Sequence, residues 1–178
     1  MVAPEFPSLS SLDYISYIDE SGCIPEDYQA KIGVYAIFDA DKCLQFVGYS
    51  RDIYLSLKQH LIRQPDKCYW FKLTTIERPS RTVLEEIRQK WLAENGTVPP
   101  GNSQAMSQWA QSIDAKLTMS EAEKQQYEQA EERAQIKLLK KIARRVEAEI
   151  EAVLKSRGVT MQFRFNPKLK EKGLLDLK

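Results

Sequence analysis

Two short apolar runs lie near the start of the chain, and turn residues separate them. Lys31–Phe38 has the pattern of a strand, Asp39–Lys42 that of a turn, and Cys43–Gly48 that of a second strand. Two such runs joined by a short polar turn predict a β-hairpin. A third strand is predicted over residues 67–77, "KCYWFKLTTIE", which is rich in aromatic and β-branched residues.

Apolar residues spaced by three or four positions predict two helices. Asp52 is suited to cap a helix that runs to about Ile62. Ser80 is suited to precede a second helix, from about Thr82 to Glu94, which Asn95-Gly96 closes. The apolar stripe of the second helix consists of Val83, Leu84, Ile87 and Trp91. The order from about 31 to 102 is therefore β-β-α-β-α, an α+β fold with a small mixed or antiparallel three-stranded sheet and flanking helices.

The last third of the chain has the pattern of a long helix. Ser120 and Glu123 form a capping box, and no Gly or Pro follows until Gly158, so we expect one long helix or two helices joined by a small break. "VTMQFRF", residues 159–165, alternates apolar and polar positions and predicts a terminal strand. Three segments follow from these patterns: an extended lead-in over 1–30 with at most one short helix, a domain over 31–117, and a charged helical extension over 118–178.

Composition narrows the class of protein. The 178 residues are 43% hydrophobic and 29% charged, as in ordinary globular proteins, and no apolar run approaches the roughly 18 to 20 residues of a membrane-spanning helix. No secretory signal pattern opens the chain. We therefore expect a cytoplasmic protein without a membrane partner. Its three scattered cysteines argue against a disulfide framework and against a zinc site.

Charge gives no global attraction to polyanions, since 26 basic and 25 acidic residues leave a formal net charge of +1. Nucleic-acid binding would need a local patch. The basic run from Lys137 to Arg145 offers one, with Lys140 and Arg144 as candidate phosphate contacts. Two alternatives stay open for this helix: a solvated face that pairs with nearby acids, or a surface for a protein partner or a second copy.

Five features in order resemble the GIY-YIG nuclease domain: Gly33-Val34-Tyr35, Phe46-Val47-Gly48, a helix with His60, a later helix with glutamates, and Asn102. The resemblance covers roughly Ile32 to Asn102. "LQFVG" and "VPPGN" are similar in particular to a cyanobacterial and chloroplast branch, in which some plant members carry a glutaredoxin domain behind the nuclease-like one. No glutaredoxin-type cysteine motif follows here, so that activity is not implied.

The resemblance implies a metal-dependent endonuclease that hydrolyses phosphodiester bonds, with DNA as the expected partner. It implies Tyr35 as general base, His60 as the neighbour that favours the phenolate, and one Mg²⁺ or Mn²⁺ ion on a helix carboxylate. We expect that ligand to be Glu86, because the apolar stripe sets it beside the buried face, with Glu85 as the alternative. Asn102 would hold the closing loop near the phosphate. Without the resemblance, simple packing is the favoured interpretation of both Tyr35 and His60.

Three residues depart from the family pattern: Phe46 replaces a tyrosine, Tyr49 a lysine and Ser56 the catalytic arginine. A cation facing the phosphoryl group contributes about 3 kcal/mol to such a reaction. Arg51 is the candidate to replace it and Arg63 the second choice, although we expect neither to share the helical face of Ser56. Two functions follow: a weak endonuclease or, alternatively, a catalytically degenerate module that binds nucleic acid or protein.

Overall fold

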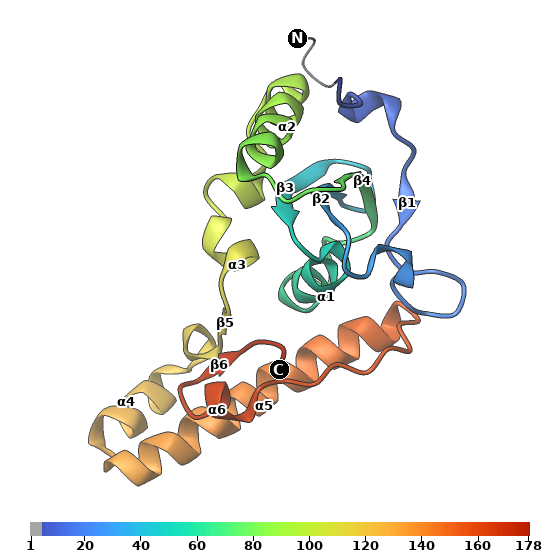
Figure 1. Ribbon diagram of the computed structural model, residues 1–178. Helices are drawn as coiled ribbons and strands as arrows, with labels where there is room; N and C mark the ends of the chain where they lie inside the picture. Colours follow the sequence, from blue (N-terminus) through green and yellow to red (C-terminus); the bar gives the residue numbers. More distant parts are fainter. Residues whose placement is uncertain (1–4) are drawn as a thin grey trace. The chain divides into compact units, whose positions relative to one another are not determined.

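The computed structural model describes residues 5–178, so the first four residues of the expected lead-in lie outside it. The chain divides into two units, one ending at Ala110 and the other spanning Gln111–Lys178. The first unit holds a sheet with flanking helices, and the second holds the long helix (Figure 1). The predicted α+β class is confirmed.

A four-stranded antiparallel sheet forms the centre of the first unit, in the order β1-β4-β2-β3. The three predicted strands are confirmed as β2 (Ile32–Phe38), β3 (Leu44–Ser50) and β4 (Trp70–Ile76). Sequence analysis did not predict β1 (Ile15–Ser16), which pairs with the start of β4. Two residues are too few to show an alternating pattern.

The two predicted helices of this unit are also confirmed, as α1 (Ile53–Arg63) and α2 (Arg81–Asn95). The side chain of Asp52 accepts a hydrogen bond from the Leu55 amide, and Ser80 does the same for the Val83 amide, as predicted for N-caps. Gly96 follows α2 in the left-handed conformation, with φ of 84°.

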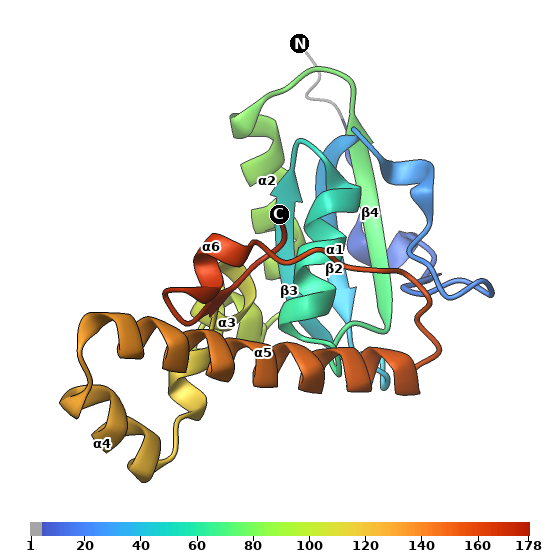
Figure 2. The same ribbon diagram turned by 90° about the horizontal axis from the view of Figure 1, so that it is seen from below.

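Both faces of β2 are buried, because a helix covers each. Val34, Ala36 and Phe38 belong to a core cluster that includes the buried residues of α2, namely Leu84, Ile87 and Trp91. Alternate residues of the strand point the other way, toward α1, where Tyr35 contacts His60. Figure 2 shows α1 crossing β2 and β3. The candidate site residues therefore lie on the α1 side of the sheet.

The segment before β2 packs into the first unit. The side chains of Tyr17 and Ile24 are fully buried, and the Tyr17 hydroxyl donates a hydrogen bond to the carbonyl of Leu57 in α1 at 2.5 Å. Two short 3-10 helices, Leu9–Ser11 and Glu26–Tyr28, lie in the same stretch. Where the structure describes it, the expected lead-in over residues 1–30 thus holds two short 3-10 helices instead of at most one helix, and buried aromatic and aliphatic groups anchor it.

The long helical region is divided in two, which was one of the two alternatives. Helix α4 (Glu121–Gln129) begins with the predicted capping box, and α5 (Glu132–Ser156) begins after a break at Ala130. The second unit also contains a 3-10 helix and three short elements, namely Ala115–Thr118, β5 (Ile113–Asp114), α6 (Pro167–Lys170) and β6 (Leu174–Leu175).

The terminal strand predicted over 159–165 does not form. Only Phe165 makes a β-bridge, with Leu177, while the paired strands of this unit are β5 and β6. An alternating pattern specifies a strand only when a partner strand of similar length lies beside it. None of the helices within residues 5–178 has the length and apolar character needed to cross a membrane.

Replacing Gly33 with alanine should destabilise the first unit, because a Cβ atom there would lie 2.1 Å from the Thr74 carbonyl oxygen and 2.9 Å from Ile53. Overpacking of this kind costs about 1–3 kcal/mol. Urea denaturation of Gly33→Ala measures the loss. Thr75→Ala, an exposed change on the neighbouring strand, serves as control and should stay within about 0.5 kcal/mol of wild type. Equal stability of both variants would contradict the expected clash.

Candidate functional site

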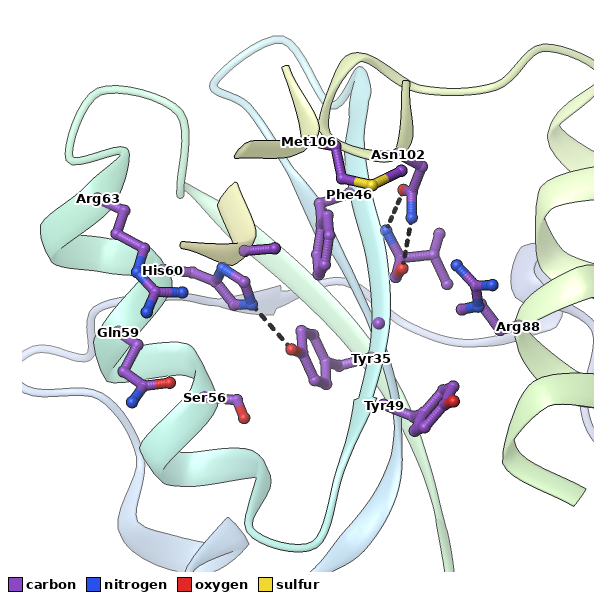
Figure 3. A pocket seen from close by; sticks show the side chains of 13 residues that line it. Tyr35, Phe46, Tyr49, Ser56, Gln59, His60, Arg63, Arg88, Asn102 and Met106 are labelled. Atoms are coloured by element: carbon purple, nitrogen blue, oxygen red, sulfur yellow. Dashed lines mark hydrogen bonds between the residues drawn. The ribbon is translucent and has the colours of Figure 1, made fainter. Parts of the chain in front are cut away.

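A pocket of about 410 Å³ opens beside β3 in the first unit (Figure 3). Strands β2 and β3, helices α1 and α2, the short 3-10 helix Pro100–Asn102 and α3 (Met106–Ala110) all contribute to its lining. The lining includes six charged, aromatic or hydrogen-bonding side chains, namely Tyr35, Phe46, His60, Arg63, Arg88 and Asn102. The structure therefore brings together three of the predicted site residues, namely Tyr35, His60 and Asn102.

Tyr35 and His60 form a buried hydrogen bond, 2.8 Å from the phenol oxygen to Nε2 of the imidazole. Their exposed fractions are 3% and 5%. Gly48 makes room for this pair, because a Cβ atom at that position would lie 3.0 Å from the Tyr35 hydroxyl and 2.5 Å from the Phe46 ring. The glycine of the second motif thus lets the tyrosine of the first reach the helix.

Burial keeps both groups neutral near pH 7. Desolvation raises the pKa of Tyr35 well above its ordinary value, although a hydrogen bond with Ser56 and the charge of Arg63 partly oppose this rise. Desolvation also lowers the pKa of His60 to about 3, and the nearby Arg63 charge adds to that effect. A neutral imidazole supplies no positive charge to favour a phenolate. The expected assistance of His60 to Tyr35 therefore lacks its electrostatic basis.

Aromatic rings form the wall around this pair. The Phe46 ring stacks on Trp109 with a centroid distance of 5.5 Å and an interplanar angle of 4°, and it lies 4.6 Å from the His60 ring. The residue that replaces the family's second tyrosine therefore acts in packing. Because its ring excludes water from His60, it contributes to the desolvation that holds the imidazole neutral.

Asn102 is a clamp for the neighbouring strand. Its Oδ1 accepts a hydrogen bond from the Val47 amide and its Nδ2 donates one to the Val47 carbonyl, both at 2.8 Å. The primary amide reproduces the pairing of a backbone peptide group. We expected Asn102 to hold the loop near a phosphate. The structure does fix the loop, but the side-chain oxygen and nitrogen are both used in doing so.

The expected metal ligand, Glu86, is exposed on α2 and does not line the pocket. The alternative, Glu85, lies on the face of α2 that carries Arg88, whose Nη2 and Nε donate to its two carboxylate oxygens at 2.6 and 3.1 Å. Gln89 donates to the same carboxylate at 2.9 Å. Hydrogen bonds from Arg88 and Gln89 hold the pKa of Glu85 at about 2.

This donor set does not fit the single divalent ion that the resemblance implies. The one carboxylate beside the pocket is already neutralised by an arginine, and the other points away. Within residues 5–178 no cluster of three or more histidine, cysteine, aspartate or glutamate side chains has a geometry that could hold a metal ion. A hard cation binds oxygen ligands that are free to coordinate it.

The cations of the site differ from those expected. Arg51 is exposed and does not line the pocket, whereas Arg63 lines it and donates a hydrogen bond to the Trp109 carbonyl at 3.0 Å. Our expectation for Arg63 was wrong: seven residues are two helical turns, so Arg63 and Ser56 share a face, and both line the pocket. Arg88 was missed, although its position three residues after Glu85 puts it on the same face of α2.

The two predicted phosphate contacts of the second unit have different surroundings. Lys140 is partly buried, and its ammonium group forms an ion pair with Glu171 at 3.5 Å. Arg144 is exposed. Among the residues that the structure describes, Lys140 therefore has a carboxylate partner and Arg144 has none.

No protein-family model matches the chain. A comparison with curated proteins finds similarity to the bifunctional monothiol glutaredoxin-S16, chloroplastic, of Arabidopsis thaliana, with 36% identity over 105 residues. The match covers 57% of this chain and 34% of that protein, so the chain spans about a third of the length of this relative.

Acid should destabilise the first unit through His60. Its pKa is about 3 in the folded protein and near 6.5 when unfolded, so below pH 6.5 the unfolded state binds a proton that the folded state excludes. Stability therefore falls as the pH falls from about 6.5 toward 3, with a loss of about 2 kcal/mol between pH 7 and pH 5.

Urea denaturation at these two pH values measures the loss, with His60→Gln as the variant that lacks the titrating group. The difference between pH 7 and pH 5 should shrink in this variant by most of the 2 kcal/mol. An unchanged difference would show that His60 is not held neutral by burial.

Proposed function

We propose that the first unit is a nuclease-like module of the GIY-YIG kind that binds a nucleic-acid phosphate in the pocket and has lost most or all of its catalytic power. The observation that carries this proposal is the composition of the pocket. It gathers the motif residues Tyr35, His60 and Asn102 beside two arginines, while none of the described residues that line it carries a carboxylate.

The arginines supply the attraction. Arg63 and Arg88 line the same cavity, and guanidinium groups are well suited to bind phosphate oxygens through paired N–H donors. Ser56 and Gln59 add neutral polar groups. Arg88 is already paired with Glu85, so a phosphate competes with the Glu85 carboxylate for the guanidinium group of Arg88.

Catalysis is weakly supported by the same residues. The phenol of Tyr35 is a poor base because burial raises its pKa, and Ser56 occupies the place of the catalytic arginine. No free carboxylate among the lining residues offers itself to a divalent ion. A pocket with these properties retains binding more readily than hydrolysis.

Similarity to the chloroplast protein adds limited support. Some plant members of the family branch that the sequence resembles carry a glutaredoxin domain behind a nuclease-like one, and the relative is named both bifunctional and glutaredoxin. Because the match covers about a third of that protein, its redox activity is not proposed for this chain. The three cysteines of this chain are Cys23, Cys43 and Cys68, widely separated in sequence.

Two substitutions with opposite effects test the binding proposal. Glu85→Gln frees Arg88 and should tighten binding of a fluorescein-labelled single-stranded DNA about threefold to tenfold. Arg88→Gln combined with Glu85→Gln removes the cation without leaving an unpaired carboxylate and should weaken it below wild type by a similar factor. Fluorescence anisotropy at about 50 mM salt measures both.

The matched control is Glu86→Gln, which removes the same charge from an exposed position outside the pocket. Its affinity should stay close to that of wild type. If Glu86→Gln tightened binding as much as Glu85→Gln, net charge would account for the effect and the pocket proposal would fail.

A weak endonuclease is the second candidate, and the Tyr35–His60 hydrogen bond beside the pocket favours it. Restoring the missing cation with Ser56→Arg should raise plasmid nicking about a hundredfold, as expected for a cation that faces the phosphoryl group. Gel electrophoresis of supercoiled plasmid measures the rate. Ser56→Arg with Tyr35→Phe is the control, and nicking that survives in it would come from another site or a contaminant.

A further inference from the structure

Helix α5 carries an exposed row of four basic residues on one face. Arg133, Lys137, Lys141 and Arg144 follow each other at intervals of four, four and three residues, which places them along one side of a helix. The row spans about 17 Å at 1.5 Å per residue. We name these four residues the α5 basic row.

Three acidic residues of this unit form ion pairs with cations outside the row. Glu147 pairs with Lys170 at 2.6 Å, Glu171 with Lys140 at 3.5 Å, and Glu123 with Arg145 at 2.9 Å. No carboxylate within residues 5–178 forms an ion pair with a member of the α5 basic row. The ion pairs of the unit therefore segregate charge and leave one face of the helix positive.

The large apolar residues of α5 are not available on its surface. Leu138, Leu139, Ile142, Val146, Ile150 and Leu154 are buried, and no large apolar side chain of the helix is exposed. A protein interface has an apolar core with few charged residues, which this face lacks. Binding to a phosphate backbone requires only a row of cations at suitable spacing.

We propose that the α5 basic row is a docking surface for the phosphate backbone of double-stranded DNA. It goes beyond the pocket of the first unit, because its residues belong to the other unit. It contacts phosphates without reading bases, since four lysine and arginine side chains on a smooth helix face supply charge alone. Glu151 lies on the same side of α5, seven residues after Arg144, and bounds the surface at its C-terminal end. The footprint is therefore limited to about four phosphates.

Salt dependence tests this surface on the full chain. Affinity for a fluorescein-labelled DNA duplex, measured by anisotropy between about 50 and 200 mM salt, should fall as the salt concentration rises. The four phosphate contacts of the row should contribute about −3.6 to the slope of log affinity against log salt concentration. Lys141→Gln should reduce that slope by about 1 and weaken binding about threefold to tenfold at the lower salt concentration.

Lys155→Gln is the matched control, because Lys155 is exposed on the same helix beyond Glu151 and outside the row. Its slope should equal that of wild type. Equal slopes for wild type and Lys141→Gln, or equal changes for the two variants, would overturn the proposal. A third result would also overturn it: the wild type runs as a dimer on gel filtration, and Lys141→Gln abolishes the dimer but leaves the salt slope unchanged. The surface would then bind a second copy of the chain.

The pocket proposal and the proposal for the α5 basic row can be overturned independently of each other. In the background of Arg88→Gln with Glu85→Gln, the pocket is altered and the α5 basic row is intact, so Lys141→Gln should still reduce the slope by about 1. Loss of the Lys141→Gln effect in this background would count against an independent row. An effect of Glu85→Gln equal to that of Glu86→Gln, with the Lys141→Gln effect preserved, would overturn the pocket alone.

Discussion

The hydrogen bond between Tyr35 and His60 is the interaction on which the first unit's site depends. It joins β2 to α1 across the sheet face, and it exists only because Gly48 leaves room for the phenol and because Phe46 and Trp109 exclude water from the imidazole. The same exclusion keeps both partners uncharged. The two residues that the resemblance implies for catalysis are thus in hydrogen-bond contact, but in an environment that suppresses their acid–base chemistry.

Charge in the site is arranged around this neutral centre. Arg63 and Arg88 stand at the pocket, and Glu85 is held by Arg88 so tightly that its carboxylate stays ionised and occupied. The partners of these cations include the Trp109 carbonyl and the Glu85 carboxylate. Under the proposed function, phosphate binding depends on exchange between these partners and the incoming anion.

Local signals explain which features could be predicted from the sequence. The three long strands follow from short apolar runs bounded by turn residues, and the two capped helices follow from apolar spacing and the side chains of Asp52 and Ser80, all of which act over a few residues. The choice between Glu85 and Glu86 could not be made in this way, because a rotation of α2 by one residue exchanges them and only packing against β3 fixes it. Arg88 escaped notice because its role arises from Glu85 and not from a motif. The tail at 159–165 had the right alternation but no partner strand of its own length.

Asn102 has a consequence for assembly. Strand β3 ends the sheet on one side, and the amide of Asn102 occupies both the donor and the acceptor of Val47 that would face outward there. A strand from a neighbouring molecule would have to displace the loop before it could add to the sheet at that point, so the loop protects the sheet against edge-to-edge aggregation. Asn102, which lines the pocket, therefore also helps to keep further strands from adding to the four-stranded sheet.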